Sequence, residues 1–88
     1  MRIVDGMVVM LVGDAWVAVP TGDATERLRG VVRLNETAKA VWDGIAEGLG
    51  EGEMAARFCD RYDIDEEHAL ASVRRTVETL VEAGVVDR

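Results

Sequence analysis

The chain has 88 residues, 49% of them apolar, which allows one compact domain with a modest core and no deep pocket for a large cofactor. Seventeen acidic residues against ten basic ones give a formal charge of −7, which argues against nucleic acid as a partner because phosphate binding requires a basic surface. The single cysteine fits a reducing cytoplasm, and we find neither a signal peptide nor a stretch that could span a membrane. We therefore expect one cytoplasmic domain over residues 1–88.

The first third of the chain has the composition of β-strands. Residues 7–12 and 15–19 are short runs of β-forming residues, and the Gly13-Asp14 pair between them suits the two-residue turn of a hairpin. Pro20 closes the second run. These two runs therefore predict an antiparallel pair of strands.

A third strand is expected after a polar loop. Residues 21–26 are mainly polar and include a glycine, which predicts a loop. The third strand is predicted over Val31 to Leu34, and its start can lie as early as Leu28. Within it Val32 and Leu34 share one face. Three strands with one buried face form a small antiparallel meander.

From Asn35 onward the apolar residues recur at the spacing of helices. Asn35 is a favourable N-cap for a first helix, which Gly48 and Gly50 end. A second amphipathic stretch runs from about residue 51 to 62, and Asp65 caps a third and longest helix. The apolar stripe of this last helix consists of Leu70, Val73, Val77, Leu80 and Val81.

The end of the chain is expected to fold back on the core. Gly84 fits the position just after the third helix, where a left-handed residue is favourable, and Val85 would then contact Leu80. The order of elements is three strands followed by three helices, with a short turn between the last two helices. This order predicts an α+β fold of the winged helix-turn-helix type.

No constellation for catalysis is recognisable. Cys59 and His68 are the only residues of their kinds, and neither has another soft ligand at metal-binding spacing, so we interpret both as structural. Ser72, the only serine, lies in the middle of a predicted helix without a nucleophile elbow. We expect no enzymatic activity, no metal and no cofactor.

The charged residues of the helices have two interpretations each. Arg74 and Arg75, with Arg57 and Arg61, could form a small anion-binding spot, although a solvated helix face is the default. A winged-helix domain often reads DNA with the N-terminal residues of its last helix. Here residues 65–67 are all acidic and would repel phosphates, which disfavours a DNA-binding regulator.

Several motifs resemble one known family. Residues 32–38, which read VRLNETA, and the following Val41-Trp42 resemble the LNETGALIW signature of the PqqD-like proteins, also called RiPP precursor recognition elements. Residues 55–86 resemble the family's second helix, its Y-D-V-D turn, its long third helix and its closing L-x-x-x-G-L-L, and the VAVP of residues 17–20 resembles stand-alone members. The differences are Ala38 in place of glycine, Glu51-Gly52-Glu53 at the second helix, and VRRTV at 73–77, which lacks an aromatic residue.

This resemblance implies a peptide-binding chaperone without a reaction of its own. Members of the family capture the leader segment of a ribosomally made precursor peptide. They present its core to a separate modifying enzyme, such as a radical S-adenosylmethionine protein, a protease or a cyclase. The leader is held as an added strand beside the third strand, in a groove walled by the third helix. Main-chain hydrogen bonds would supply affinity and side-chain pockets would supply selectivity.

The resemblance places the peptide-binding residues on these two elements. The strand would offer the backbone groups of Val31, Val32, Arg33 and Leu34. The third helix would contribute Ala69, Val73, Thr76, Val77 and Leu80 from one arc and Arg74 from the opposite flank. Arg33 and Arg74 would attract acidic leader residues. The simpler interpretation of Val73, Val77 and Leu80 is that they belong to the core.

A homodimer and three other functions are also compatible with the sequence. A free strand edge would also let two copies form a homodimer. The alternative functions are a winged-helix DNA-binding regulator, a generic protein-protein adaptor and a small acidic carrier domain. A carrier domain would need an exposed attachment serine at a helix start, which Ser72 does not supply.

Overall fold

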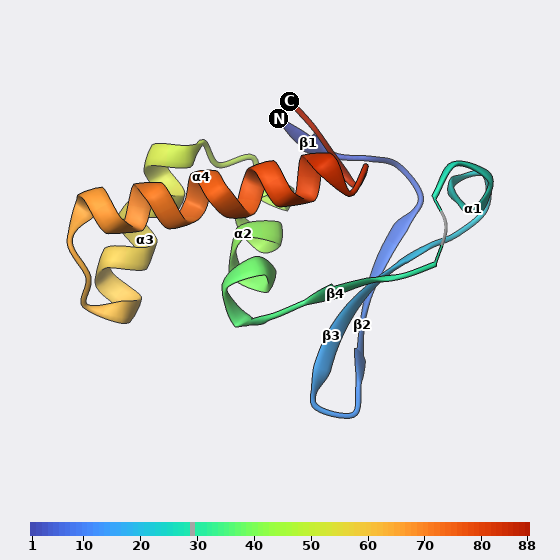
Figure 1. The fold of residues 1–88 in the computed structure, drawn as a ribbon, viewed down its shortest axis with the longest axis horizontal. Helices are drawn as coiled ribbons and strands as arrows, with labels where there is room; N and C mark the ends of the chain where they lie inside the picture. The colour runs from blue at the N-terminus through green and yellow to red at the C-terminus, as the bar shows by residue number, and fades with distance from the viewer. Residues whose placement is uncertain (29) are drawn as a thin grey trace.

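The elements follow one another in the order that the sequence predicts, with three short additions. A computed structural model of the chain describes residues 1–28 and 30–88. A three-stranded antiparallel sheet stands beside a group of helices, and the two termini lie next to each other (Figure 1). The elements are β1 (Arg2–Ile3), β2 (Met7–Val12), β3 (Ala15–Pro20), α1 (Ala24–Arg27), β4 (Val32–Leu34), α2 (Glu36–Ala46), α3 (Glu51–Tyr62), α4 (Glu66–Glu82) and β5 (Val86–Asp87).

The hairpin of β2 and β3 projects away from the helices (Figure 1). Gly13 has a φ of 64°, a left-handed conformation that glycine adopts without strain, and Val12 stands directly opposite Ala15. The pairing continues without a bulge to Met7 opposite Pro20. The predicted two-residue hairpin is confirmed.

Strand β4 completes the sheet at the edge opposite β2. The strand order is β2-β3-β4, and both pairings are antiparallel. The register between β3 and β4 is Trp16 opposite Leu34, Val17 opposite Arg33 and Ala18 opposite Val32. Strand β4 is one residue shorter than predicted. A start as early as Leu28 would include Arg29, which lies outside the described residues.

The long helices begin where capping side chains can accept backbone hydrogen bonds. The Asn35 side chain accepts from the N–H of Ala38 at 2.8 Å at the start of α2. The Asp65 carboxylate accepts from the N–H of His68 at 2.8 Å at the start of α4. Both predicted caps are confirmed. Between α3 and α4 the chain turns at Asp63, whose φ is 52°.

Helix α4 ends as predicted at Gly84. Gly84 has a φ of 81°, its N–H donates to the Val81 carbonyl, and the N–H of Val85 donates to the Leu80 carbonyl at 3.1 Å. This pair of bonds defines a Schellman ending and turns the chain back toward the core. Val85 and Val86 are both buried there, which confirms the prediction.

The core lies between the inner faces of the helices and one face of the sheet. Helix α4 contributes its inner residues from Ala69 to Leu80, and Trp42 of α2 and Phe58 of α3 fill the space beneath it. Ala18 and Leu34 bring the sheet into the same cluster. The predicted winged helix-turn-helix fold is therefore confirmed.

Three short elements were not predicted. Strand β1 pairs with β5, with Ile3 opposite Val86, because the chain that follows Gly84 runs back beside the N-terminus. The single turn α1 occupies part of the predicted loop. Its Ala24 is buried against Gly6, where a β-carbon would stand 3.0 Å from the Ala24 Cβ. Pairing and packing between distant segments, rather than local pattern, produce these elements.

Candidate functional site

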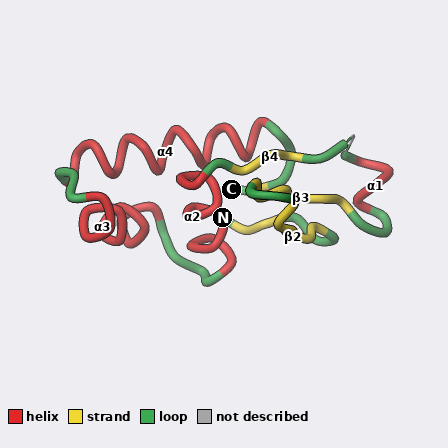
Figure 2. The backbone as a smooth tube through the Cα atoms, turned by 90° about the horizontal axis from the view of Figure 1, so that it is seen from below, coloured by secondary structure: helices red, strands yellow, loops and turns green. Residues whose placement is uncertain are grey.

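A cleft of about 550 Å³ lies between strand β4 and helix α4. Figure 2 shows β4 beside the C-terminal half of α4. The cleft's first wall is the segment in which the chain passes from β4 into α2. Its lining residues on this wall are Val32, Arg33, Leu34, Asn35, Thr37 and Ala38.

The backbone of this wall offers free hydrogen-bonding groups at Arg33. The N–H of Thr21 donates to the Gly6 carbonyl at 2.7 Å in the β2-β3 pairing. Bonding direction alternates along a strand, so the odd-numbered residues of β3 bond to β2 and the even-numbered ones bond to β4. In the observed register Val32 and Leu34 therefore bond to β3. The N–H and C=O of Arg33 point away from the sheet, along the edge that faces the cleft.

The second wall is a stripe of mostly small and polar residues on α4. These residues recur at three- and four-residue steps and so share one face of the helix. They are Ser72, Arg75, Thr76, Thr79 and Leu80 of α4 and its C-cap residue Ala83. The hydroxyls of Thr76 and Thr79 donate to the carbonyls of Ser72 at 2.9 Å and Arg75 at 3.0 Å. Their donors are therefore used within the helix, and their oxygens retain lone pairs that can accept.

The charge of the cleft is opposite to that of the chain. Arg33 on the strand wall and Arg75 on the helix wall are its two charged lining residues, in a chain whose formal charge is −7. This positively charged cleft attracts a carboxylate. The attraction is stronger at low salt, because added salt screens exposed charges.

The structure brings half of the predicted site residues together. Five of them line the cleft: Val32, Arg33, Leu34, Thr76 and Leu80. Ala69, Val73 and Val77 are fully buried in the core, which agrees with the simpler interpretation of Val73 and Val77. Leu80 is buried as well, although it also lines the cleft. Val31 is exposed next to β4 but does not line the cleft, and neither does the exposed Arg74.

The other lining residues were not predicted to bind the peptide. The predicted groove lay on the apolar stripe of the third helix, whereas the cleft is lined by the neighbouring stripe, about one residue further around the helix. A usable signal was present in the spacing of Ser72, Thr76, Thr79 and Ala83, which places small side chains along one face where a ligand backbone can approach. Arg75, rather than Arg74, is the arginine on that face.

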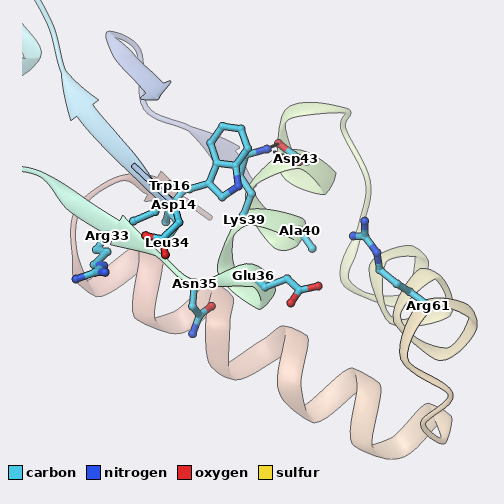
Figure 3. Close-up of a pocket in the computed structure, with 11 residues that line it drawn as sticks. Asp14, Trp16, Arg33, Leu34, Asn35, Glu36, Lys39, Ala40, Asp43 and Arg61 are labelled. Atoms are coloured by element: carbon cyan, nitrogen blue, oxygen red, sulfur yellow. Dashed lines mark hydrogen bonds and ion pairs between the residues drawn. The ribbon is translucent and has the colours of Figure 1, made fainter. Parts of the chain in front are cut away.

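A second cleft of about 550 Å³ lies on the other side of the β4-α2 junction. Figure 3 shows the Trp16 ring beside Lys39, whose Nζ lies 4.4 Å from the ring centroid. The same ammonium group forms an ion pair with Asp43 at 2.6 Å. These contacts hold the end of the hairpin against α2. Arg33, Leu34 and Asn35 line both clefts, so the junction separates two hollows on one surface.

Arg57, which the sequence offered for an anion-binding spot, is instead paired with an acidic side chain. Arg57 forms a two-bond ion pair with Glu47 at 2.8 and 3.0 Å, and this hydrogen bonding lowers the pKa of the Glu47 carboxyl. Burial raises the pKa of the Cys59 thiol, which disfavours the reactive thiolate. Within residues 1–28 and 30–88 no three His, Cys, Asp or Glu side chains gather closely enough to hold a metal ion. None of the described helices is long and apolar enough to cross a membrane.

Comparisons with known proteins agree with the resemblance noted in the sequence. The fold matches the solved structure of "TbiB1 in Complex with the TbiA(beta) Leader Peptide" with a TM-score of 0.80 and 18% sequence identity, over 99% of this chain and 95% of that one. A search of curated proteins gave no match. The family model described as "Coenzyme PQQ synthesis protein D (PqqD)" matches residues 8–86. The chain therefore belongs to the PqqD family.

Proposed function

We propose that this chain binds the leader segment of a ribosomally made precursor peptide and presents the peptide to a separate modifying enzyme. The observation that carries the proposal is the cleft between β4 and α4, which joins a free strand edge to a helix face of small residues. Membership of the PqqD family supports it, as does the similarity in fold to TbiB1, a protein whose solved structure contains a leader peptide. The proposed role is binding without catalysis.

The leader would enter the cleft as a fourth strand beside β4. With the leader antiparallel to β4, the outward N–H and C=O of Arg33 would exchange both hydrogen bonds with one leader residue. Such pairing is independent of side chains. Selectivity would then come from leader residues that point toward α4, where the face of Thr76, Thr79 and Ala83 leaves space for them.

The cleft's charge further restricts the peptide. A leader residue that lies between Arg33 and Arg75 would be acidic, because both walls offer a cation and neither offers an anion. The attraction would mainly raise the association rate and would weaken with salt.

The first experiment measures leader binding by two variants of one residue. Arg33→Pro removes the outward N–H without removing a bond between β3 and β4, whereas Arg33→Ala removes the side chain and keeps the N–H. The probe is the leader half of a short peptide encoded beside this chain, titrated by isotope-edited NMR. We expect Arg33→Ala to bind several-fold more weakly and Arg33→Pro to lose binding altogether. Equal affinities of Arg33→Pro and wild type, with the fold verified, would rule out strand addition.

Presentation to an enzyme needs its own test. The modification rate of the full precursor by the enzyme encoded beside it is measured with and without this chain. We expect modification to depend on the chain and to fail with Arg33→Pro. If the enzyme modifies the precursor at the same rate without this chain, then the chain binds the leader but does not present it to the enzyme.

DNA binding has weaker support from the same fold. The first turn of α4, the position that would meet DNA, carries Glu66 and Glu67, both exposed, next to the capping Asp65. Three acids at that end would face phosphate groups. We expect no retention of the chain on heparin at low salt.

A further inference from the structure

Strand β2 carries an unusual concentration of exposed apolar side chains. The exposed fractions are 46% for Val8, 48% for Met10, 57% for Leu11 and 58% for Val12. Side chains alternate along a strand, so Leu11 lies on one face of the sheet and the other three lie on the opposite face. A partner that covered one face would leave the other exposed. A partner strand at the edge would contact both.

The edge of β2 also lacks the features that prevent strand pairing. The strand reads MVVMLV, with no charge, no proline and no bulge against β3. Among the described elements, β3 is its only substantial neighbour. The opposite edge differs, because β4 has only three residues, carries Arg33 and faces α4 across the cleft. Of the two sheet edges, β2 is therefore the longer one and the one that no described helix faces.

The backbone direction determines which residues would pair. Gly6 accepts from Thr21, so the even-numbered residues of β2 bond to β3 and the N–H and C=O groups of Met7, Val9 and Leu11 point outward. A second β2 strand running antiparallel about a two-fold axis at Val9 would pair Val9 with its own copy and Met7 with Leu11. Val8 would then stand opposite Met10. Each pair in this register joins two apolar residues.

We propose that β2 is a homodimer interface, in which two copies pair through this strand and form a continuous six-stranded sheet. The occupant of the edge is a second copy because the segment from Met7 to Leu11 is complementary to itself about Val9 and carries no charge to select a different partner. The interface joins two copies of net charge −7, so repulsion opposes it at low salt. Dimerisation is therefore weak and strengthens with salt.

The dimer leaves the β4-α4 cleft free. Strands β2 and β4 are opposite edges of the sheet, so the two clefts lie at the outer ends of the six-stranded sheet. The inference does not rest on leader binding. A leader peptide is expected to bind monomer and dimer equally, whereas a dimer formed through β4 would be dissociated by the leader.

Sedimentation velocity over a concentration series tests the interface. Wild type is compared with Met10→Lys and with Ile64→Lys, which places the same charge on an exposed apolar residue in the α3-α4 turn. We expect a wild-type dimer that grows with protein and salt concentration, a loss of at least about tenfold in dimer affinity for Met10→Lys, and no change for Ile64→Lys. A wild type that stays monomeric at about 1 mM and about 0.5 M salt, where the Debye length is about 4 Å, would overturn the proposal.

Disulfide formation tests the register. In a Cys59→Ser background, Val9→Cys places two thiols at the axis, where the paired Cα atoms stand about 5.5 Å apart. Val12→Cys is the control, because its two copies would lie about 20 Å apart along the strands. We expect mild oxidation to cross-link the first variant and not the second, although Val12 is the more exposed residue. Preferential cross-linking of the Val12→Cys variant would contradict this register.

Discussion

The two faces of helix α4 differ in what they contribute to the protein. One face carries Ala69, Val73 and Val77, which are fully buried. The neighbouring face carries Ser72, Thr76 and Thr79, which line the cleft beside β4. Thr76 and Val77 are adjacent in the chain and nearly identical in shape, yet the first is accessible to a ligand and the second is not. In a small domain, the most apolar stripe of a helix is therefore needed for the core.

The largest expected effect comes from placing a charge on each face. Val77→Asp would bury an uncompensated carboxylate, which costs at least about 3 kcal/mol of the about 5–15 kcal/mol that stabilise such a domain. Thr76→Asp places the same group at the accessible face, and we expect that variant to remain folded. Circular dichroism with urea unfolding measures both. Equal unfolding midpoints of the two variants would mean that the Thr76 face is as deeply buried as the Val77 face.

Filling the cleft is expected to abolish ligand binding without unfolding the protein. Thr76→Trp adds a large ring to the helix wall and leaves the buried face of α4 unchanged. We expect loss of measurable leader binding by calorimetry and a melting temperature within a few degrees of the wild type. If the variant binds the leader as the wild type does, the leader lies elsewhere.

The fold was predictable because local signals agree with tertiary packing. Asn35 and Asp65 cap helices whose apolar stripes face one core, and the Gly13 turn joins strands of equal length. The missed elements depend on partners far away in sequence. Ile3 pairs with Val86 only because the Gly84 turn brings the two ends together. No sequence pattern within either short segment predicts that pairing.

Charge reversal at two adjacent arginines is expected to have a smaller effect on leader affinity. The pair distinguishes binding in the cleft from binding at the outer surface of α4. Arg75 lines the cleft and Arg74 is exposed outside it. We expect Arg75→Glu to weaken binding of an acidic leader roughly tenfold, about 1.4 kcal/mol, and to reduce the salt dependence. Arg74→Glu should change the affinity by less than about twofold. A larger loss from Arg74→Glu would show that the peptide contacts the other flank of α4.

Only half of the candidate site could be predicted, because tertiary packing also decides which face of α4 lines the cleft. The expected strand residues Val32 to Leu34 do line the cleft, since a strand that leads directly into a capped helix has little freedom of position. The helix residues were less certain, because the rotation of α4 about its axis is set by packing against Trp42 and Phe58. If α4 were rotated about its axis by one residue, Arg74 would line the cleft in place of Arg75.

The smallest expected effect is on the pH dependence of stability. It concerns the N-cap at the start of α4. The His68 N–H and side chain bond to the Asp65 carboxylate and hold its pKa below the ordinary value of about 3.9. A lowered folded pKa means that the carboxylate stabilises the protein above the unfolded pKa, and that this contribution is lost as the pH falls through the folded pKa. Asp65→Asn keeps a capping oxygen but cannot titrate. We therefore expect wild type to exceed Asp65→Asn in urea midpoint at pH 7 and to lose that advantage in acid. A difference that stays constant down to about pH 2.5, well below the unperturbed aspartate pKa of about 3.9, would show that the charge of Asp65 contributes nothing to the cap.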